Sequence, residues 1–230
     1  SFIEYFTKEA DIYQTIRTTD PKTRLTVNRP DEDLIPIMMN LIEKTTGNLF
    51  IILHSYGSHF NYKERYPLAY QKFTPDNLTA VSRRQKEQLV NTYDNSILYT
   101  DYFLSSTLQA LEQINIPSLV LYTSDHGEDL FDDDRGLFLH SSPTPSYYQL
   151  HIPFFLWFSD SFIDAHPEQY QLAQQRKKEP ISTHVIFHTL LDAADIQTPY
   201  LKREFSLVHP QFKAIPRQYL NDHDLAVPYQ

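Results

Sequence analysis

The stretch that decides the fold is "SLVLYTSDHGEDLFDDDRGLFLH", residues 118–140, in which a short apolar run leads directly into a polar segment. Residues 118–123 are mostly aliphatic or aromatic and are followed by turn-forming residues, which predicts a strand buried on both faces. In open α/β sheets, ligands bind beyond the carboxyl ends of the strands. The polar segment is therefore either one wall of a binding site at a sheet edge or an ordinary solvated acidic loop.

Similar apolar runs and helical patterns occur elsewhere along the chain. Two more runs predict strands, at 48–53 and 152–158. Helical spacing of apolar residues predicts helices at 31–45, 88–114 and 183–194. In the longest of these, one face carries Ile97, Leu104, Leu108 and Leu111.

This order of strands and helices is typical of an α/β protein, and we expect a mostly parallel sheet sandwiched by helices. The sequence contains no internal repeat and no low-complexity tract, so residues 1–230 are predicted to form a single domain. Residues 200–230 carry little periodicity and are predicted to be a tail that wraps the surface.

Composition excludes several classes of function. The formal net charge of −9 argues against nucleic acid as a partner, because such proteins present a basic face. The chain has no Cys, which excludes a disulfide scaffold and a thiolate zinc site. No stretch approaches the ~18 apolar residues that a membrane helix needs.

Asp125 and His126 are the strongest candidate metal ligands, since a carboxylate oxygen and an imidazole nitrogen both bind zinc. Both side chains reach one ion only if the backbone turns sharply, which Gly127 permits. The alternative is a helix-capping Asp beside an exposed His. Glu128 either orients a histidine of the site or is a carboxylate at a helix start.

A second polar group follows the run at 48–53. Here His59 and Ser58 are candidates for contact with an anionic substrate, and His54 is either part of the same site or a buried histidine bonded to backbone. If the strands are parallel, this group and Asp125, His126 and His140 leave the same sheet edge.

Five blocks of the chain together resemble the phosphoethanolamine transferases of bacterial envelopes, which belong to the alkaline phosphatase and sulfatase superfamily. In sequence order the blocks are "LHSYGSHFNYKERYP", "NTYDNSILYTDYFLSS", "YTSDHGEDLFDDDRGLFLH", "HIPFFLWFS" and "HVIFHTLLDAADI". The resemblance covers roughly residues 30 to 200. It implies an alkaline-phosphatase-like fold and a zinc-dependent transferase.

The resemblance also implies roles for individual residues. Asp125 and His126 would bind the catalytic zinc, and His59 and His140 would hold the phosphoryl group or a second metal. The Thr nucleophile and a further Glu ligand of the family match nothing in this sequence, so both are expected to precede residue 1. The chain is then N-terminally truncated, and 1–230 alone is expected to bind zinc weakly and to be inactive.

Partners and location follow from the same resemblance. Phosphatidylethanolamine would be the donor, an envelope glycolipid such as lipid A the acceptor, and the location a bacterial inner membrane with this domain facing the periplasm. The family's membrane anchor would precede residue 1.

Two alternatives stay open. Residues 131–136 stand where relatives carry "GENG", which leaves the acceptor undefined. A sulfatase or phosphodiesterase would use the same zinc site with water as final acceptor, although the absence of Cys removes one route to a sulfatase nucleophile. A catalytically silent module that binds an envelope partner is the other alternative.

Overall fold

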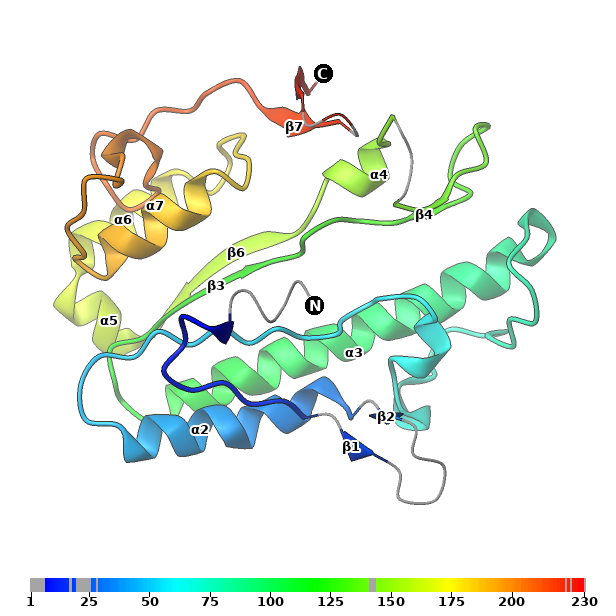
Figure 1. Cartoon of the computed structure of the whole chain (residues 1–230), viewed down its shortest axis with the longest axis horizontal. Coiled ribbons are helices and arrows are strands. Elements are labelled where there is room, and N and C mark those ends of the chain that lie inside the picture. The colour runs from blue at the N-terminus through cyan, green and yellow to red at the C-terminus, as the bar shows by residue number, and fades with distance from the viewer. Residues whose placement is uncertain are drawn as a thin grey trace. The chain divides into compact units, whose positions relative to one another are not determined.

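The computed structural model describes residues 7–16, 18–19, 26–27, 29–140, 144–221, 223 and 225–229 (Figure 1). The chain divides into two compact units. One comprises Ser1–Asp76 and Asn91–Thr107, and the other comprises Asn77–Val90 and Leu108–Gln230. The prediction of a single domain stays a prediction.

The helices and strands have the following bounds. The first unit holds β1 Thr18–Thr19, β2 Thr26–Val27, α2 Leu34–Lys44 and the short 3-10 helices Asp31–Asp33, Tyr62–Glu64 and Leu68–Tyr70. The long helix α3, Lys86–Glu112, contributes to both units. The second unit holds β3 Leu119–Thr123, β4 Asp129–Leu130, β5 Phe138–Leu139, α4 Tyr147–Leu150, β6 Phe154–Phe158, α5 Asp160–Ala165, α6 Pro167–Gln175, α7 Val185–Ala193, β7 Gln218–Leu220, β8 Ala226–Pro228 and the 3-10 helices Arg83–Gln85 and Arg203–Phe205.

The helices predicted at 31–45, 88–114 and 183–194 are confirmed as α2 with its preceding 3-10 turn, α3 and α7. The predicted buried face of α3 is wrong in part, because Ile97 is 45% exposed. The buried stripe instead includes Thr92, Asn95, Ser96, Tyr99, Thr100, Phe103 and Thr107. Apolar periodicity misses such a stripe because its polar members are buried with hydrogen bonds: Thr100 donates to the Ser96 carbonyl and Thr107 to that of Phe103.

A buried carboxylate organises the loop that precedes α3 in the first unit. Asp76 is 4% exposed, and its Oδ2 accepts hydrogen bonds from Lys63 Nζ at 2.5 Å and from the Tyr66 hydroxyl at 2.7 Å. Its Oδ1 accepts one from Gln71 Nε2 at 2.6 Å. Burial pushes the pKa of Asp76 up, but the three donors together hold it below its usual value.

Because the pKa of Asp76 is lower in the folded than in the unfolded state, the unfolded chain takes up the proton first on acidification. The stabilisation from Asp76 is therefore complete above the unfolded pKa of about 3.9 and is lost as pH falls through the folded value. We expect Asp76→Asn to cost about 2 kcal/mol at pH 7, because it weakens the buried hydrogen bonds from Tyr66 and Gln71, whereas Lys63 is 41% exposed and keeps contact with water. Urea unfolding at pH 7 and pH 3 measures both effects.

In the Asp76→Asn variant, the loss of stability between the two pH values should be smaller than in the native protein. The matched control is Asp101→Asn, an exposed position on α3 in the same unit, which should change neither quantity beyond about 0.5 kcal/mol. Equal acid sensitivity of the Asp76 variant and the native protein would count against this assignment.

In the second unit, the strands predicted at 118–123 and 152–158 are confirmed as β3 and β6. They pair antiparallel, from Leu119 opposite Phe158 to Thr123 opposite Phe154. The expectation of parallel neighbours is therefore wrong for this pair, because an apolar run shows that a strand is buried but not which way its neighbour runs.

The run at 48–53, predicted to be a strand, pairs with none of the described residues and forms no strand. Residues 48–50 and 52 are exposed and residues 51 and 53 are partly buried, with Phe50 and Ile52 at 72% and 74% exposure. The prediction fails for a simple reason: an apolar run shows which side chains avoid water, but a strand also needs a hydrogen-bonding partner.

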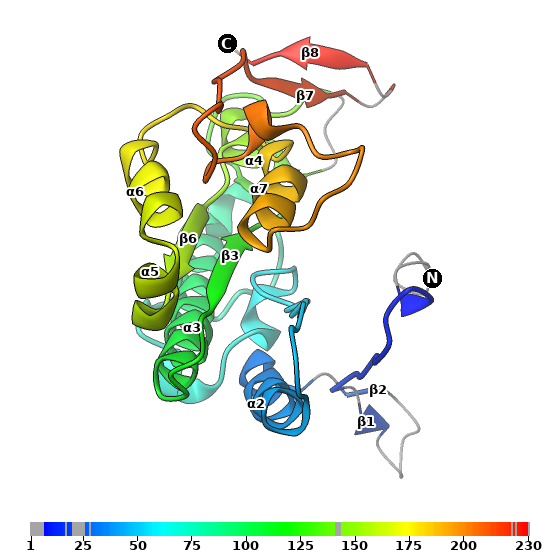
Figure 2. The ribbon, with the colours of Figure 1, turned by 90° about the vertical axis from the view of Figure 1, so that its left-hand side faces the viewer.

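The core of the second unit forms where β6 leads into α5. Phe158, Phe162, Ala193 and Val208 pack together there, joined by partly buried side chains of β3 and α6. Ser159 caps α5 by accepting a hydrogen bond from the Phe162 amide. Figure 2 shows α5 and α6 on the side of β6 and α7 on the side of β3. These helices flank the strand pair, and β4 and α4 lie beyond its opposite end (Figure 1).

Residues beyond 200 contribute to this core and also form a hairpin. Val208, 2% exposed, belongs to the core, and β7 and β8 pair antiparallel. Among the described residues, no helix combines the length and apolarity needed to cross a bilayer.

Candidate metal centre

The hairpin after β3 brings Glu128 and His140 together. Its strands β4 and β5 pair Asp129 with Leu139 and Leu130 with Phe138. Continuing this antiparallel register outward by one residue places Glu128 opposite His140. Two residues that are twelve apart in the sequence thus become neighbours through the register of a short hairpin.

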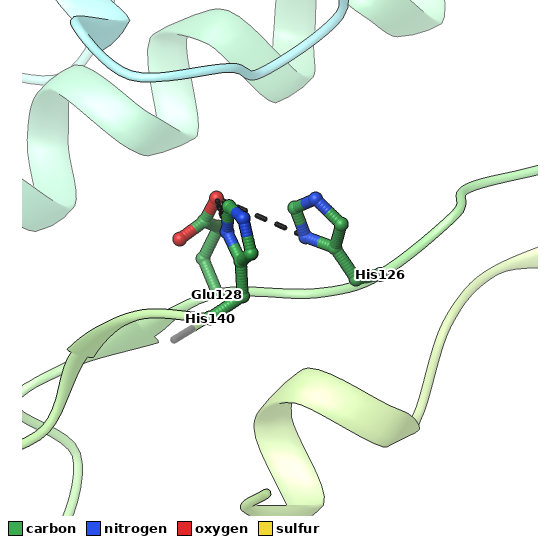
Figure 3. Close-up of side chains that lie close together, drawn as sticks. All are labelled: His126, Glu128 and His140. Carbon is green, nitrogen blue, oxygen red and sulfur yellow. Dashed lines mark hydrogen bonds and ion pairs between the residues drawn. The ribbon is translucent and has the colours of Figure 1, made fainter. Parts of the chain in front are cut away.

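His126 completes a cluster with these two residues (Figure 3). Its ring stacks on that of His140, with 3.7 Å between the ring centroids and 30° between the planes. Glu128 Oε1 lies 3.1 Å from His140 Nδ1 and 3.9 Å from His126 Nδ1. One ligand atom from each residue lies within 4.8 Å of the others, so small side-chain movements would bring all three onto one metal ion.

The chemistry of the cluster fits a divalent cation. Two imidazoles and one carboxylate form the kind of donor set that holds catalytic zinc and leaves one position open. The Glu128 side chain is only 6% exposed, and its second oxygen, Oε2, is buried without a hydrogen-bond partner in the described part of the chain. A buried carboxylate oxygen with no donor is costly, and a bound cation would satisfy it.

Hydrogen bonds to helix α4 hold residues 127–129, the segment that carries Glu128. The Gly127 amide donates to the Gln149 carbonyl at 2.9 Å, and Gln149 Nε2 donates to the carboxylate of Asp129. Both Asp129 and Gln149 are buried, at 1% and 5% exposure. A Cβ at position 127 would lie 2.0 Å from the carbonyl oxygen of Tyr148, so only Gly allows this approach.

Two basic residues donate hydrogen bonds to the acidic turn that joins β4 and β5. Lys86 Nζ donates to the Phe131 carbonyl at 2.7 Å, and Arg83 donates to the Asp134 carbonyl at 2.9 Å. The contacts of Lys86 and Arg83 with this turn were not predicted from the sequence. No local signal reveals them, because they lie 45 and 51 positions from the carbonyls they bind.

Asp125, the predicted partner of His126 on the metal, lies beside the cluster. Its side chain is 86% exposed, and its Oδ2 is 3.7 Å from His126 Nε2. Its Oδ1 accepts a hydrogen bond from the His126 amide at 3.0 Å. Its role as a metal ligand stays a prediction, as does that of His126, and so does the role of His140 in holding the phosphoryl group or a second metal. Glu128, expected to orient a histidine or to start a helix, belongs to the cluster itself.

The remaining predicted residues lie in the first unit. His54 and His59 are exposed, so His54 is not a buried histidine. His59 Nδ1 lies 2.5 Å from the Phe60 carbonyl oxygen. The hydroxyl oxygen of Ser58 is buried and has no hydrogen-bond partner among the described residues. The contact of these three with a substrate stays a prediction.

Comparison with known proteins defines the class. A profile of the sulfatase family matches residues 1–196, and the chain belongs to this family. The predicted resemblance to phosphoethanolamine transferases is confirmed by solved structures. The C-terminal periplasmic domain of phosphoethanolamine transferase EptC from Campylobacter jejuni is 38% identical with a TM-score of 0.69, over 81% of this chain and 60% of that one.

Two further structures extend the comparison. The integral membrane protein lipooligosaccharide phosphoethanolamine transferase A from Neisseria meningitidis is 32% identical with a TM-score of 0.71, over 77% of this chain and 34% of that one. The C-terminal periplasmic domain of EptC from Escherichia coli, crystallised in complex with Zn, shares the fold at 24% identity and a TM-score of 0.83, over 99% of this chain and 64% of that one.

These matches show an alkaline-phosphatase-like α/β fold, as predicted. The chain spans about a third of the length of the curated relatives that it matches.

Proposed function

We propose that this chain is part of a zinc-dependent enzyme that transfers phosphoethanolamine from a phospholipid donor to an envelope glycolipid such as lipid A. The observation that carries the proposal is the cluster of His126, Glu128 and His140, whose buried Glu128 oxygen lacks a partner in the described residues. A divalent cation held there would bind an anionic phosphoryl group and stabilise the charge that develops as the group is transferred.

The proposed transferase activity is supported by the relatives, which are phosphoethanolamine transferases and include a lipooligosaccharide phosphoethanolamine transferase. Phosphatidylethanolamine as donor is the part of the proposal carried by the sequence resemblance alone. The Neisseria relative is an integral membrane protein and the Campylobacter one has a periplasmic domain, which supports a periplasmic location beside the inner membrane.

Each residue has a proposed role. His126, Glu128 and His140 would hold zinc, with Asp125 near enough to His126 to complete the set after a side-chain rotation. Zinc, when bound, would stabilise negative charge on the phosphoryl group and lower the pKa of the attacking Thr hydroxyl. His59, with Ser58 and His54 nearby in sequence, would donate hydrogen bonds to the phosphoryl oxygens or protonate the leaving group.

The two chemical steps would be consecutive substitutions at phosphorus. The Thr hydroxyl, on a segment upstream of residue 1, loses its proton and displaces the diacylglycerol oxygen, which takes up a proton. The acceptor hydroxyl would then lose its proton and displace the Thr oxygen from phosphorus, and the Thr oxygen would take up a proton, so that the phosphoethanolamine ends on the acceptor and the Thr hydroxyl is restored.

The test is mass spectrometry of glycolipid after incubation with phosphatidylethanolamine and the full protein in membranes. We expect the acceptor to gain phosphoethanolamine, chelation to stop the reaction, and added zinc to restore it. Release of free phosphoethanolamine without an acceptor product would favour the hydrolase alternative. Absence of both products, with zinc supplied, would favour the catalytically silent module and overturn the proposal.

A further inference from the structure

Asp31 is a buried carboxylate in the first unit that binds a distant turn. It is 8% exposed, and its two oxygens accept hydrogen bonds from consecutive backbone amides, Oδ1 from Tyr56 at 2.8 Å and Oδ2 from Gly57 at 2.9 Å. These amides are 25 and 26 residues away in the sequence. Hydrogen bonds to a charged carboxylate are about twice as strong as neutral ones, so this pair fixes the turn firmly.

The position of Asp31 suggests a simpler role, which its contacts do not support. It is the first residue of the 3-10 helix Asp31–Asp33, where a carboxylate is ordinarily explained by its attraction to the positive end of the helix. The N-cap residue itself is Pro30, whose side chain has no atom that could accept a hydrogen bond. Both oxygens of Asp31 are instead directed to the turn at Tyr56 and Gly57.

The bound turn leads directly into Ser58 and His59. Gly57 has φ of +55°, a left-handed conformation that reverses the chain just before these two residues. The Tyr56 ring then meets the His59 ring edge to face, with 5.4 Å between centroids. The centroid of the Tyr56 ring also lies 4.0 Å from the guanidinium carbon of Arg65, and the Arg65 side chain is 6% exposed. The imidazole of His59 is thus placed by a turn that is held from two sides.

We infer that Asp31 is a positioning residue for His59: by holding the amides of Tyr56 and Gly57, it sets the direction in which the imidazole points. This inference rests on the proposed function, in which His59 contacts the phosphoryl group. Asp31 itself touches no reacting atom. We call the two hydrogen bonds from the Tyr56 and Gly57 amides to Asp31 the clamp. Small misplacement of a group that contacts the substrate is costly in catalysis, so loss of the clamp should lower the rate while leaving the fold intact.

The experiment is a double-mutant cycle in the full protein, with transfer to the glycolipid as the measured rate. We expect Asp31→Asn to reduce kcat about tenfold, because the Asn side chain offers one acceptor oxygen and faces the second amide with a donor. His59→Ala should reduce kcat further. In the His59→Ala background, Asp31→Asn should have no additional effect, since the group that it positions is already gone.

The control is Asp33→Asn, a carboxylate in the same 3-10 helix that pairs with Arg29 and should leave the rate unchanged. Equal fold-losses from Asp31→Asn in both backgrounds would show a general structural effect and overturn the inference, as would full activity of His59→Ala. Hydrogen–deuterium exchange of the peptide spanning residues 53–60 reports on the clamp separately from function.

Faster exchange in Asp31→Asn than in the native protein is expected whether or not transfer is the reaction. Unchanged exchange would overturn the clamp. Failure of the native protein to transfer or hydrolyse, together with faster exchange in the variant, would instead locate the error in the proposed function.

Discussion

Glu128→Gln and His140→Ala are each expected to lower transfer activity of the full protein by at least about a hundredfold and to reduce its bound zinc. The Gln side chain keeps the shape of Glu128 but removes the negative charge, and its amide would face His140 Nδ1, now 3.1 Å from Glu128 Oε1. Removing the imidazole of His140 deletes one of only three clustered ligand groups. Loss of a direct ligand costs more than loss of a group that merely orients one, which is typically worth 10- to 100-fold.

Matched controls lie on the same unit. His166 and Glu168 are an exposed histidine and an exposed acid at the start of α6, and His166→Ala and Glu168→Gln should keep native activity and zinc content. Activity is measured as phosphoethanolamine added to glycolipid, and zinc by elemental analysis of the purified protein. Native zinc content and activity in both cluster variants would refute the proposed centre.

Gly127→Ala is expected to destabilise the second unit by about 3 kcal/mol or more. Unlike most glycines that resist substitution, Gly127 is required for space and not for a positive φ: the new methyl carbon would lie 2.0 Å from the Tyr148 carbonyl oxygen and 3.1 Å from its carbon. Backbone atoms on both sides have to separate, which breaks the bond from the Gly127 amide to the Gln149 carbonyl. The site then loses its support from α4.

Trp157 lies in β6 and is the single Trp of the chain, so its fluorescence during urea unfolding reports on this unit. Gly57→Ala is the comparison and lies in the first unit, so its unfolding in urea is followed by far-UV circular dichroism, as is that of Gly127→Ala. The Gly57 substitution places a methyl group where the nearest atom is 4.0 Å away but at φ of +55°, and should cost only about 1 kcal/mol. Similar small costs for both variants would mean that α4 does not pack on Gly127 as described.

Local pattern predicted the elements of the fold well and their pairing poorly. Apolar runs and helical periodicity located β3, β6, α2, α3 and α7, because each is determined by side chains close in sequence. The run at 48–53 has equally apolar side chains but forms no strand, since pairing depends on residues elsewhere in the chain. The polar stripe of α3 was hidden in part for the same reason, because the partner of Asn95, the Phe73 carbonyl, lies outside the helix.

Some residues of the candidate site could likewise be predicted from the sequence, and others could not. Asp125, His126 and His140 stand out in the sequence because polar residues follow a predicted strand, and the structure brings two of them together with Glu128. The burial of Glu128 could not be read from the sequence, since an acid after His-Gly is ordinarily a solvated one. Asp31 was missed altogether, because it resembles any acidic residue at a helix start and only the folded chain shows which amides it binds.

The most direct test of the metal centre is anomalous diffraction from crystals of the protein grown with zinc, measured on both sides of the zinc absorption edge. We expect an anomalous peak about 2.0–2.2 Å from a ring nitrogen of His126 and of His140 and from a carboxylate oxygen of Glu128. A zinc peak bound elsewhere, with these three side chains still paired only to one another, would contradict the account.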